Sequence, residues 1–148
     1  MTSTVTRLVN HIGLTVTDLE TSVAFYRDVV GMEIAKRGFK TGGEWFDTLT
    51  ENAGAIIDAV TLRAGDVHLQ LVQYHAAGNP EPATGHNRVG NLHFCINVDD
   101  VDAKHAEITA SGAHQPTAIV KLPVPGVRSF YVRDPDGVPV EFLQLPGA

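Results

Sequence analysis

The stretch His11-Ile-Gly-Leu-Thr-Val-Thr-Asp18 has a counterpart later in the chain, His93-Phe-Cys-Ile-Asn-Val-Asp-Asp100. Both stretches begin with a histidine and reach an aspartate seven positions later, and both lead through an amphipathic segment to a glycine, Gly31 or Gly112. An internal repeat in a chain of 148 residues indicates a duplicated supersecondary unit. Because histidine is the commonest metal ligand, its presence at matching positions also suggests a site to which both halves contribute.

The first copy has the pattern of a strand followed by a helix and further strands. Apolar and polar residues alternate over residues 9–16, which predicts a strand with one side on a core. Thr17-x-x-Glu20 is a capping box that would begin a helix, and Gly31 would end that helix as its C-cap. The elements expected after it are a strand at 32–39, a short helix or flap with an apolar underside at 40–55, and a hairpin of strands at 56–64 and 67–74.

The second copy follows a segment rich in glycine and proline, residues 75–91, which predicts a linker between a first module at 1–74 and a second at 92–148. Asp99 or Asp100 would cap the helix of the second copy. The strands expected around that helix lie at 92–97, 114–120, 126–132 and 138–145. Both copies therefore predict the order β-α-β-β-β, and we expect an α+β protein of two tandem βαβββ modules.

The composition is that of an ordinary globular protein, and it argues against several functions. The net charge is −6 and no cluster of lysine or arginine occurs, which disfavours a nucleic-acid partner. No apolar run approaches the roughly 20 residues of a membrane helix, and the first residues lack the apolar core of a signal peptide. One cysteine leaves no internal disulfide framework. We therefore expect a cytoplasmic protein with no membrane partner.

Four side chains are candidate metal ligands. If the apolar side of each first strand packs on its helix, His11 and His93 lie on the opposite, concave side of their sheets. Gln70 and Glu141 stand at corresponding places on the last strand of each copy. If the two sheets close around a common cup, two imidazoles, an amide oxygen and a carboxylate converge there. Such a set suits one divalent ion, Co, Ni, Mn, Zn or Fe, with open positions for a chelating substrate.

Each of these residues also has a structural interpretation when it is considered alone. A single strand histidine is most often a structural group, and glutamine is a poor metal ligand. Glu141 is more informative, because it lies in the apolar run Val138-Pro-Val-Glu-Phe-Leu, where a carboxylate needs a cation, a hydrogen-bond donor or a metal. The occurrence of all four residues at repeat-related positions favours the metal site.

Two longer motifs resemble the vicinal oxygen chelate superfamily, which includes glyoxalase I, methylmalonyl-CoA epimerase, extradiol dioxygenases and fosfomycin- and bleomycin-resistance proteins. The motifs, within a resemblance that runs from Val9 to Gln144, are His11-Ile-Gly-Leu-x-Val-x-Asp18-Leu19 with Phe25-Tyr26, and Phe130-Tyr131-x-x-Asp134-Pro135-x-Gly137-x-x-x-Glu141. The superfamily places metal ligands on the first and last strands of each module. The resemblance therefore implies the ligands His11, Gln70, His93 and Glu141, a set most similar to that of the epimerase branch.

The chemistry of the superfamily implies a reaction beside a metal-chelated carbonyl, and our leading hypothesis is an epimerase or isomerase. Such an enzyme needs a base that removes a proton and a group that returns one. His68 is a candidate base if it faces the cup beside Gln70, and Tyr131 is a candidate donor of a proton or hydrogen bond. Further candidate bases lie within 40–55: Glu44, Asp47 and Glu51.

Three alternatives remain open. An extradiol-type Fe(II) dioxygenase would share the two histidines and the glutamate, but its pattern has a histidine shortly before the Phe-Tyr pair, where this chain has Leu122-Pro-Val-Pro-Gly-Val-Arg-Ser. A glyoxalase I would normally have a glutamate in place of Gln70 and a basic anchor for glutathione. A drug-sequestering resistance protein often lacks the metal ligands that this chain retains.

The expected partner is a small molecule that chelates the metal, either a ketone of sugar or cyclitol type or a CoA thioester. The lack of clustered basic residues weakens the CoA thioester, because phosphate groups usually need cationic partners. Arg128 and Arg133 are the possible anchors. A homodimer is expected by analogy with the superfamily.

Overall fold

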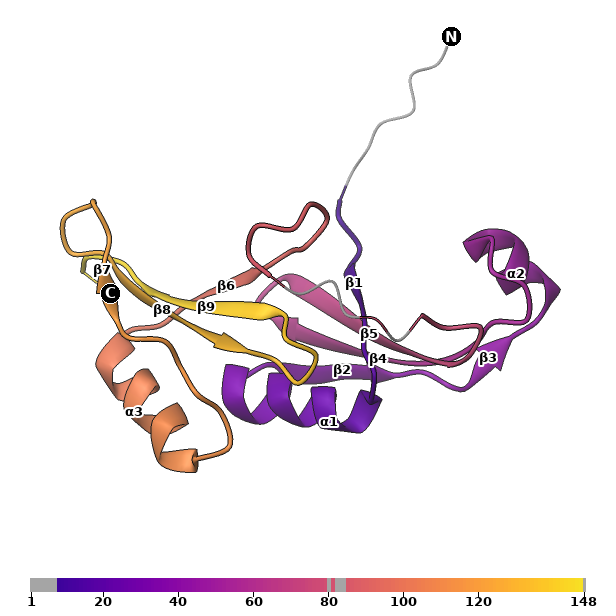
Figure 1. Cartoon of the computed structure of the whole chain (residues 1–148), viewed down its shortest axis with the longest axis horizontal. Coiled ribbons are helices and arrows are strands. Elements are labelled where there is room, and N and C mark those ends of the chain that lie inside the picture. Colours follow the sequence, from indigo (N-terminus) through magenta and orange to yellow (C-terminus); the bar gives the residue numbers. More distant parts are fainter. Residues whose placement is uncertain (1–7, 80, 82–84, 148) are drawn as a thin grey trace, which may run out of the picture. The chain divides into compact units, whose positions relative to one another are not determined.

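Two compact units make up the computed structural model, residues 1–79 and 80–148, and the structure describes residues 8–79, 81 and 85–147. The division falls inside the segment that the sequence marks as a linker. Each unit consists of one β-sheet with a helix packed on one of its faces (Figure 1). None of the helices within the described ranges has the length and hydropathy that crossing a bilayer would require.

The first unit contains the first histidine stretch. Its elements are β1 (Ile12–Thr15), α1 (Leu19–Ala24), a π-helical turn (Phe25–Val30), β2 (Glu33–Arg37), β3 (Thr41–Gly42), α2 (Glu44–Thr50), β4 (Ile56–Ala64) and β5 (Val67–Ala76). The sheet has the order β1-β5-β4-β2, in which β1 runs parallel to β5 and the other neighbours are antiparallel. The short strand β3 pairs with β4 and leads into α2, the helix that was one of two predictions for 40–55.

The second unit contains the second histidine stretch and has the same strand topology. Its elements are β6 (Phe94–Asn97), α3 (Val101–Ser111), β7 (Val120–Lys121), β8 (Arg128–Arg133) and β9 (Pro139–Gln144). The sheet has the order β6-β9-β8-β7, in which β6 runs parallel to β9. In both units the first strand therefore lies beside the last. This arrangement confirms the predicted α+β class with two sheets.

Two glutamines show how closely the units correspond. On β5, the Gln73 side-chain oxygen accepts a hydrogen bond from the backbone N–H of Leu19, at the start of α1 (2.8 Å). On β9, the Gln144 side-chain oxygen accepts one from the N–H of Val101, at the start of α3 (3.0 Å). Each glutamine thus pairs an N–H group that a helix N-terminus leaves without an intrahelical partner. Gln144 follows Gln73 by 71 positions, the same offset that separates the two candidate ligands on these strands.

An aspartate caps the N-terminus of α1 and of α3. Asp100 accepts a hydrogen bond from the N–H of Ala103 (2.9 Å), and Asp18 accepts one from the N–H of Thr21 (2.8 Å). Hydrogen bonds from Thr21, first from its side chain and then from its N–H, hold the pKa of Asp18 below its usual value. The capping box predicted at Thr17 is therefore wrong: the N-cap lies one residue later, where a charged carboxylate is the stronger acceptor.

Replacing Asp100 with alanine should lower the free energy of unfolding by about 1 kcal/mol, the usual loss when an N-cap side chain is removed. Asparagine retains an acceptor oxygen, so Asp100→Asn should cost less than Asp100→Ala. Urea unfolding of the two variants measures the difference. An alanine variant as stable as the parent protein would show that this cap contributes nothing.

The buried side of each sheet faces its helix. In the first unit, Val23 of α1 and the strand residues Leu69 and Leu71 are completely buried. In the second unit, the rings of Phe130 and Phe142 stack at 5.1 Å between centroids on the side covered by α3. Because side chains alternate along a strand, the intervening residues of β5 and β9 lie on the other side, and these include the candidate ligands.

The strand predicted at 114–120 is wrong for most of its length. Pairing with β8 is limited to Val120 and Lys121. Pro116 has no N–H to donate, which disfavours a paired strand before them. Residues 113–119 run beside β8 in an irregular conformation, and Thr117 holds them there: its N–H donates to the Tyr131 carbonyl (2.8 Å) and its hydroxyl accepts from the Tyr131 N–H (2.9 Å).

Candidate active site

Strand pairing places the candidate ligands at equivalent positions in the two units. Gly13 lies opposite Gln70 in the β1–β5 pair, and Cys95 lies opposite Glu141 in the β6–β9 pair. Each candidate histidine precedes the first-strand partner by two positions, so it lies one residue before its strand rather than within it, as the sequence had suggested. The two halves therefore offer the same pair of positions, a histidine beside the first strand and an oxygen ligand on the last.

In the second unit the candidate residues are in contact. Glu141, with 14% of its side chain exposed, accepts hydrogen bonds at both carboxylate oxygens, from the Ser129 hydroxyl at Oε1 (2.6 Å) and the Tyr131 hydroxyl at Oε2 (2.9 Å). Nε2 of His93 lies 3.7 Å from Oε2 of Glu141, and the His93 ring meets the Tyr131 ring edge-on. The structure thus brings together three predicted site residues: His93, Tyr131 and Glu141. We call these three with Ser129 the Glu141 cluster.

The charge of Glu141 affects two neighbouring groups. Burial, together with the hydrogen bond to Glu141 and the charge of that carboxylate, raises the pKa of the Tyr131 hydroxyl to about 12. Burial and the charge of Glu141 together raise the pKa of the Cys95 thiol to about 11. Both groups are therefore neutral near pH 7, and Tyr131 is a hydrogen-bond donor to the carboxylate.

Ser129 and Cys95 are two site residues that the sequence pattern alone does not single out. Strand alternation does put Ser129 on the same side as Tyr131, and the repeat does put Cys95 at the place of Gly13. The missing information is the register between β8 and β9, which sets Tyr131 directly opposite Glu141. Such a register follows from the turn and the core packing of the folded unit, and it cannot be read from either strand by itself.

In the first unit one candidate ligand is exposed and the other is half-buried, as in the second unit. His11 is exposed, and its Nδ1 lies 2.8 Å from the side-chain oxygen of Asn10. Gln70 is half-buried on the side of β5 opposite to the completely buried leucines of that strand. His68 lies two residues before Gln70 and shares its side of the sheet, as the sequence predicts.

Helix α2 covers the same side of the first sheet as Gln70. Phe46 is buried against Ile57 and against Val72, which follows Gln70 by two residues on β5. The Phe46 ring also lies 6.5 Å from that of Tyr74, between centroids. On α2 the predicted apolar underside is thus a single buried residue, because two other apolar side chains of the helix are exposed: Trp45 and Leu49.

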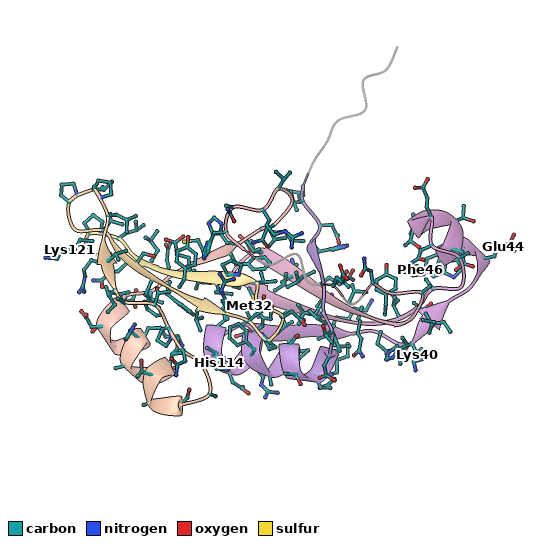
Figure 2. All side chains as sticks on the ribbon, in the orientation of Figure 1. Met32, Lys40, Glu44, Phe46, His114 and Lys121 are labelled. Atoms are coloured by element: carbon teal, nitrogen blue, oxygen red, sulfur yellow. The ribbon has the colours of Figure 1, made fainter. Side chains whose placement is uncertain are left out.

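The three acidic candidates on and after α2 differ in their surroundings. Asp47 is half-buried, and its Oδ1 atom is buried with no hydrogen-bond partner among the residues that the structure describes. Glu44 is exposed in the first turn of α2, away from the anchoring Phe46 (Figure 2). Glu51 is exposed and ends the helix with a left-handed backbone conformation (φ 52°). Asp47 is therefore the one of the three that has a buried carboxylate oxygen.

The sequence matches the model of the Glyoxalase/Bleomycin resistance protein/Dioxygenase superfamily over residues 8–142. The chain belongs to this superfamily. It is 31% identical over 145 residues to a 2-epi-5-epi-valiolone epimerase of an Actinomyces species, a match that spans 93% of this chain and 79% of the relative. It is 28% identical over 141 residues to the mitochondrial methylmalonyl-CoA epimerase of Mus musculus, a match that spans 91% of this chain and 71% of that relative. A solved glyoxalase family protein from Bacillus cereus has a similar fold, with a TM-score of 0.83, 16% identity and 97% of both chains covered.

Members of this superfamily typically bind a divalent metal, and the Glu141 cluster contains donors that suit one. The imidazole of His93 and the carboxylate of Glu141 are both common ligands of Zn, Co, Ni, Mn and Fe. Each carboxylate oxygen of Glu141 accepts one hydroxyl and has a second lone pair for another partner. Within the described part of the chain, no group of three or more His, Cys, Asp and Glu side chains is arranged to hold a metal ion by itself. The second unit thus supplies a pair of ligands that fits the metal of the superfamily.

Replacing Ser129 with alanine should lower the free energy of unfolding by about 1–3 kcal/mol, because a largely buried carboxylate oxygen loses its donor. Ser22 on α1 is a matched control. Its hydroxyl is also buried, but it has no hydrogen-bond partner within the described residues. Ser22→Ala should therefore leave the stability unchanged or raise it. Urea unfolding monitored by circular dichroism compares the two variants, and equal losses would contradict the expected role of Ser129.

Proposed function

We propose that the protein is a divalent-metal-dependent epimerase or isomerase that removes a proton beside the carbonyl group of a small ketone or thioester. The observation that carries this proposal is the Glu141 cluster, in which a histidine and a doubly hydrogen-bonded carboxylate lie side by side. The similarity to two epimerases supports the reaction class.

One ion per chain, Co, Ni, Mn, Zn or Fe, would be held by His11, Gln70, His93 and Glu141. The equivalent positions of Gln70 and Glu141 in their strand registers support this assignment. When bound, the ion stabilises, as a Lewis acid, the negative charge that develops on the substrate oxygens as the proton leaves. Glu141 is the only charged member of the set, so the ligands neutralise only part of the charge of the ion.

Ser129 and Tyr131 act as positioning residues in this proposal. Their hydroxyls donate to the two oxygens of Glu141 and fix the plane of its carboxylate. Partners of this kind orient a metal ligand, and their loss typically weakens metal binding by about 10- to 100-fold. We therefore assign Tyr131 to the orientation of Glu141, rather than to the return of the proton.

Asp47 is the residue that we propose as the base. The neighbouring Phe46 packs against Val72, two residues along β5 from Gln70, which supports this choice. The buried Oδ1 of Asp47 accepts no hydrogen bond within the described residues, which leaves a lone pair available for a proton. His68, on the same side of β5 as Gln70, is the second candidate, and the exposed Glu44 is the third.

The test is proton exchange in D₂O under anaerobic conditions. Full-length protein loaded with Co(II) is incubated with 2-epi-5-epi-valiolone or with methylmalonyl-CoA, the compounds named in the two relatives. Incorporation of deuterium beside the carbonyl group, dependent on the metal and independent of O₂, is the expected result. Turnover that requires Fe(II) and O₂ would replace the proposal with ring cleavage. Tight binding of a ligand without metal or exchange would replace it with sequestration.

We also propose that the chain acts as a homodimer in the cytoplasm, on the basis of the superfamily resemblance. Sedimentation equilibrium of the purified protein checks the first part, since a dimer has twice the mass of the 15.9 kDa chain.

A further inference from the structure

A cavity of about 370 Å³ lies at the edge of β8 in the second unit. Its size is near the lower end of the range for small-molecule sites, roughly 300–1,000 Å³. We call it the β8-edge cavity. Eight residues line it, all from the second unit, and the ones that matter chemically are His86, His114, Gln115, Thr117, Tyr131 and Arg133.

The cavity exists because the sheet edge is not filled by a strand. Beyond the short pairing with β7, the edge of β8 is accompanied only by the irregular segment 113–119, which Pro116 keeps from pairing. Thr117 attaches this segment to the backbone of Tyr131. His114 and Gln115, which shortly precede Thr117 in this segment, form one wall of the cavity, and the end of β8 forms the other.

The polar lining has the composition of an anion site. It contains a guanidinium group, Arg133, and two imidazoles, His86 and His114, and it contains no aspartate or glutamate. Nη1 of Arg133 donates to the carbonyl of Gly137 (2.6 Å), which fixes the side chain while its other N–H groups can serve a ligand. Arginine is suited to carboxylate and phosphate because its planar fork matches their paired oxygens.

The second arginine of this strand is engaged elsewhere. Nη1 of Arg128 lies 2.7 Å from a carboxylate oxygen of Asp102, and its Nη2 donates to the Gln144 side-chain oxygen (3.1 Å). Arg133 is therefore the arginine that is placed to bind an anion, and a single arginine with two imidazoles suits one anionic group rather than a chain of phosphates.

Tyr131 is a wall of the cavity and also a member of the Glu141 cluster. The His86 ring meets the Tyr131 ring edge-on at 4.8 Å between centroids, while the Tyr131 hydroxyl donates to Glu141. The side chain of Tyr131 thus connects the cavity with Glu141, the carboxylate of the candidate active site.

We infer that the β8-edge cavity binds the carboxylate or phosphate group of a small molecule, with Arg133 as its main anchor and His114 and Gln115 as further partners. The inference does not depend on the metal or on the proposed reaction. If the substrate of the proposed reaction has such a group, the cavity selects for it.

The test uses the full-length protein without added metal and follows amide signals by NMR. Sodium phosphate and sodium malonate are titrated separately at constant ionic strength, with sodium chloride as the reference. Saturable shifts at Thr117, Arg133 and the residues around His114, with a Kd on the order of 1 mM, are the expected result. Tighter binding of phosphate or of malonate identifies the preferred source of the anion.

Arg133→Gln should weaken this binding about tenfold, since it removes a charge-assisted contact, and His114→Ala should weaken it by a smaller factor. Arg63→Gln is the matched control, because Arg63 is an exposed arginine of the first unit that pairs with Glu33. Dispersed spectra of each variant show that it is folded. Binding that does not saturate, or that is equal in the Arg133→Gln, His114→Ala and control variants, would overturn the inference, whatever the outcome of the D₂O experiment.

Discussion

Replacing His93 with alanine should reduce the affinity of the protein for Co(II) by at least about 100-fold, more than the 10- to 100-fold lost when an outer partner of a metal ligand is removed. The imidazole lies 3.7 Å from Glu141 and is half-exposed, so its removal leaves no cavity in the core. The folded state should therefore persist. Metal content after dialysis and the Co(II) absorption spectrum measure the loss, and circular dichroism measures the fold.

His75 provides the matched control. It lies on β5, pairs with Asp58 at 2.8 Å and is not in the proposed ligand set, so His75→Ala should leave Co(II) binding unchanged. His11→Ala should resemble His93→Ala if the first unit contributes to the same site. Unchanged metal stoichiometry in both His11→Ala and His93→Ala would exclude the proposed ligand set. Loss in His93→Ala alone would limit the site to the second unit.

The fold could be predicted from the sequence because the pattern of the βαβββ unit occurs in both halves of the chain. The histidine stretch, the apolar alternation and the helix-ending glycine recur, and the strand orders of the two units are the same. The errors are local. Thr17 and Asp18 are both residue types that favour the N-cap, and the choice between them depends on the residue at which the helix begins after the first strand. Residues 114–120 have strand-like residues, but of these only Val120 pairs with β8, Pro116 has no N–H to donate, and the cavity lies beside the unpaired part.

The candidate site could be predicted only in part, for a different reason. Alternation along β8 is sufficient to place Tyr131 on the same side as Ser129, but the register that sets Tyr131 opposite Glu141 on β9, and so their contact, comes from the structure. The surroundings of Asp47 could not be obtained from alternation either. They depend on the rotation of α2 about its axis, and this rotation is set by the packing of Phe46 against β4 and β5. Contacts between distant segments decide such details, and a sequence pattern does not contain them.

Replacing Asp47 with asparagine should slow deuterium exchange into the substrate by about 100- to 10,000-fold, the usual contribution of a positioned general base. Asparagine has nearly the same shape, but its amide does not accept the proton. Because Phe46 anchors α2, the helix should keep its place and Co(II) should bind with unchanged affinity. Exchange rates measured by NMR with saturating metal and substrate separate this loss from any change in binding.

Glu44→Gln makes the same chemical change three residues earlier on α2, at a side chain that is exposed to solvent. It should leave the exchange rate within about twofold of the parent, because a solvated carboxylate adds little to the proton transfer that we assign to the half-buried Asp47. The opposite pattern, a large loss in Glu44→Gln and none in Asp47→Asn, would assign the base to Glu44. Equal and small effects of both substitutions would show that the base does not lie on α2. His68→Ala would then be expected to abolish exchange, since His68 shares the side of β5 that carries Gln70.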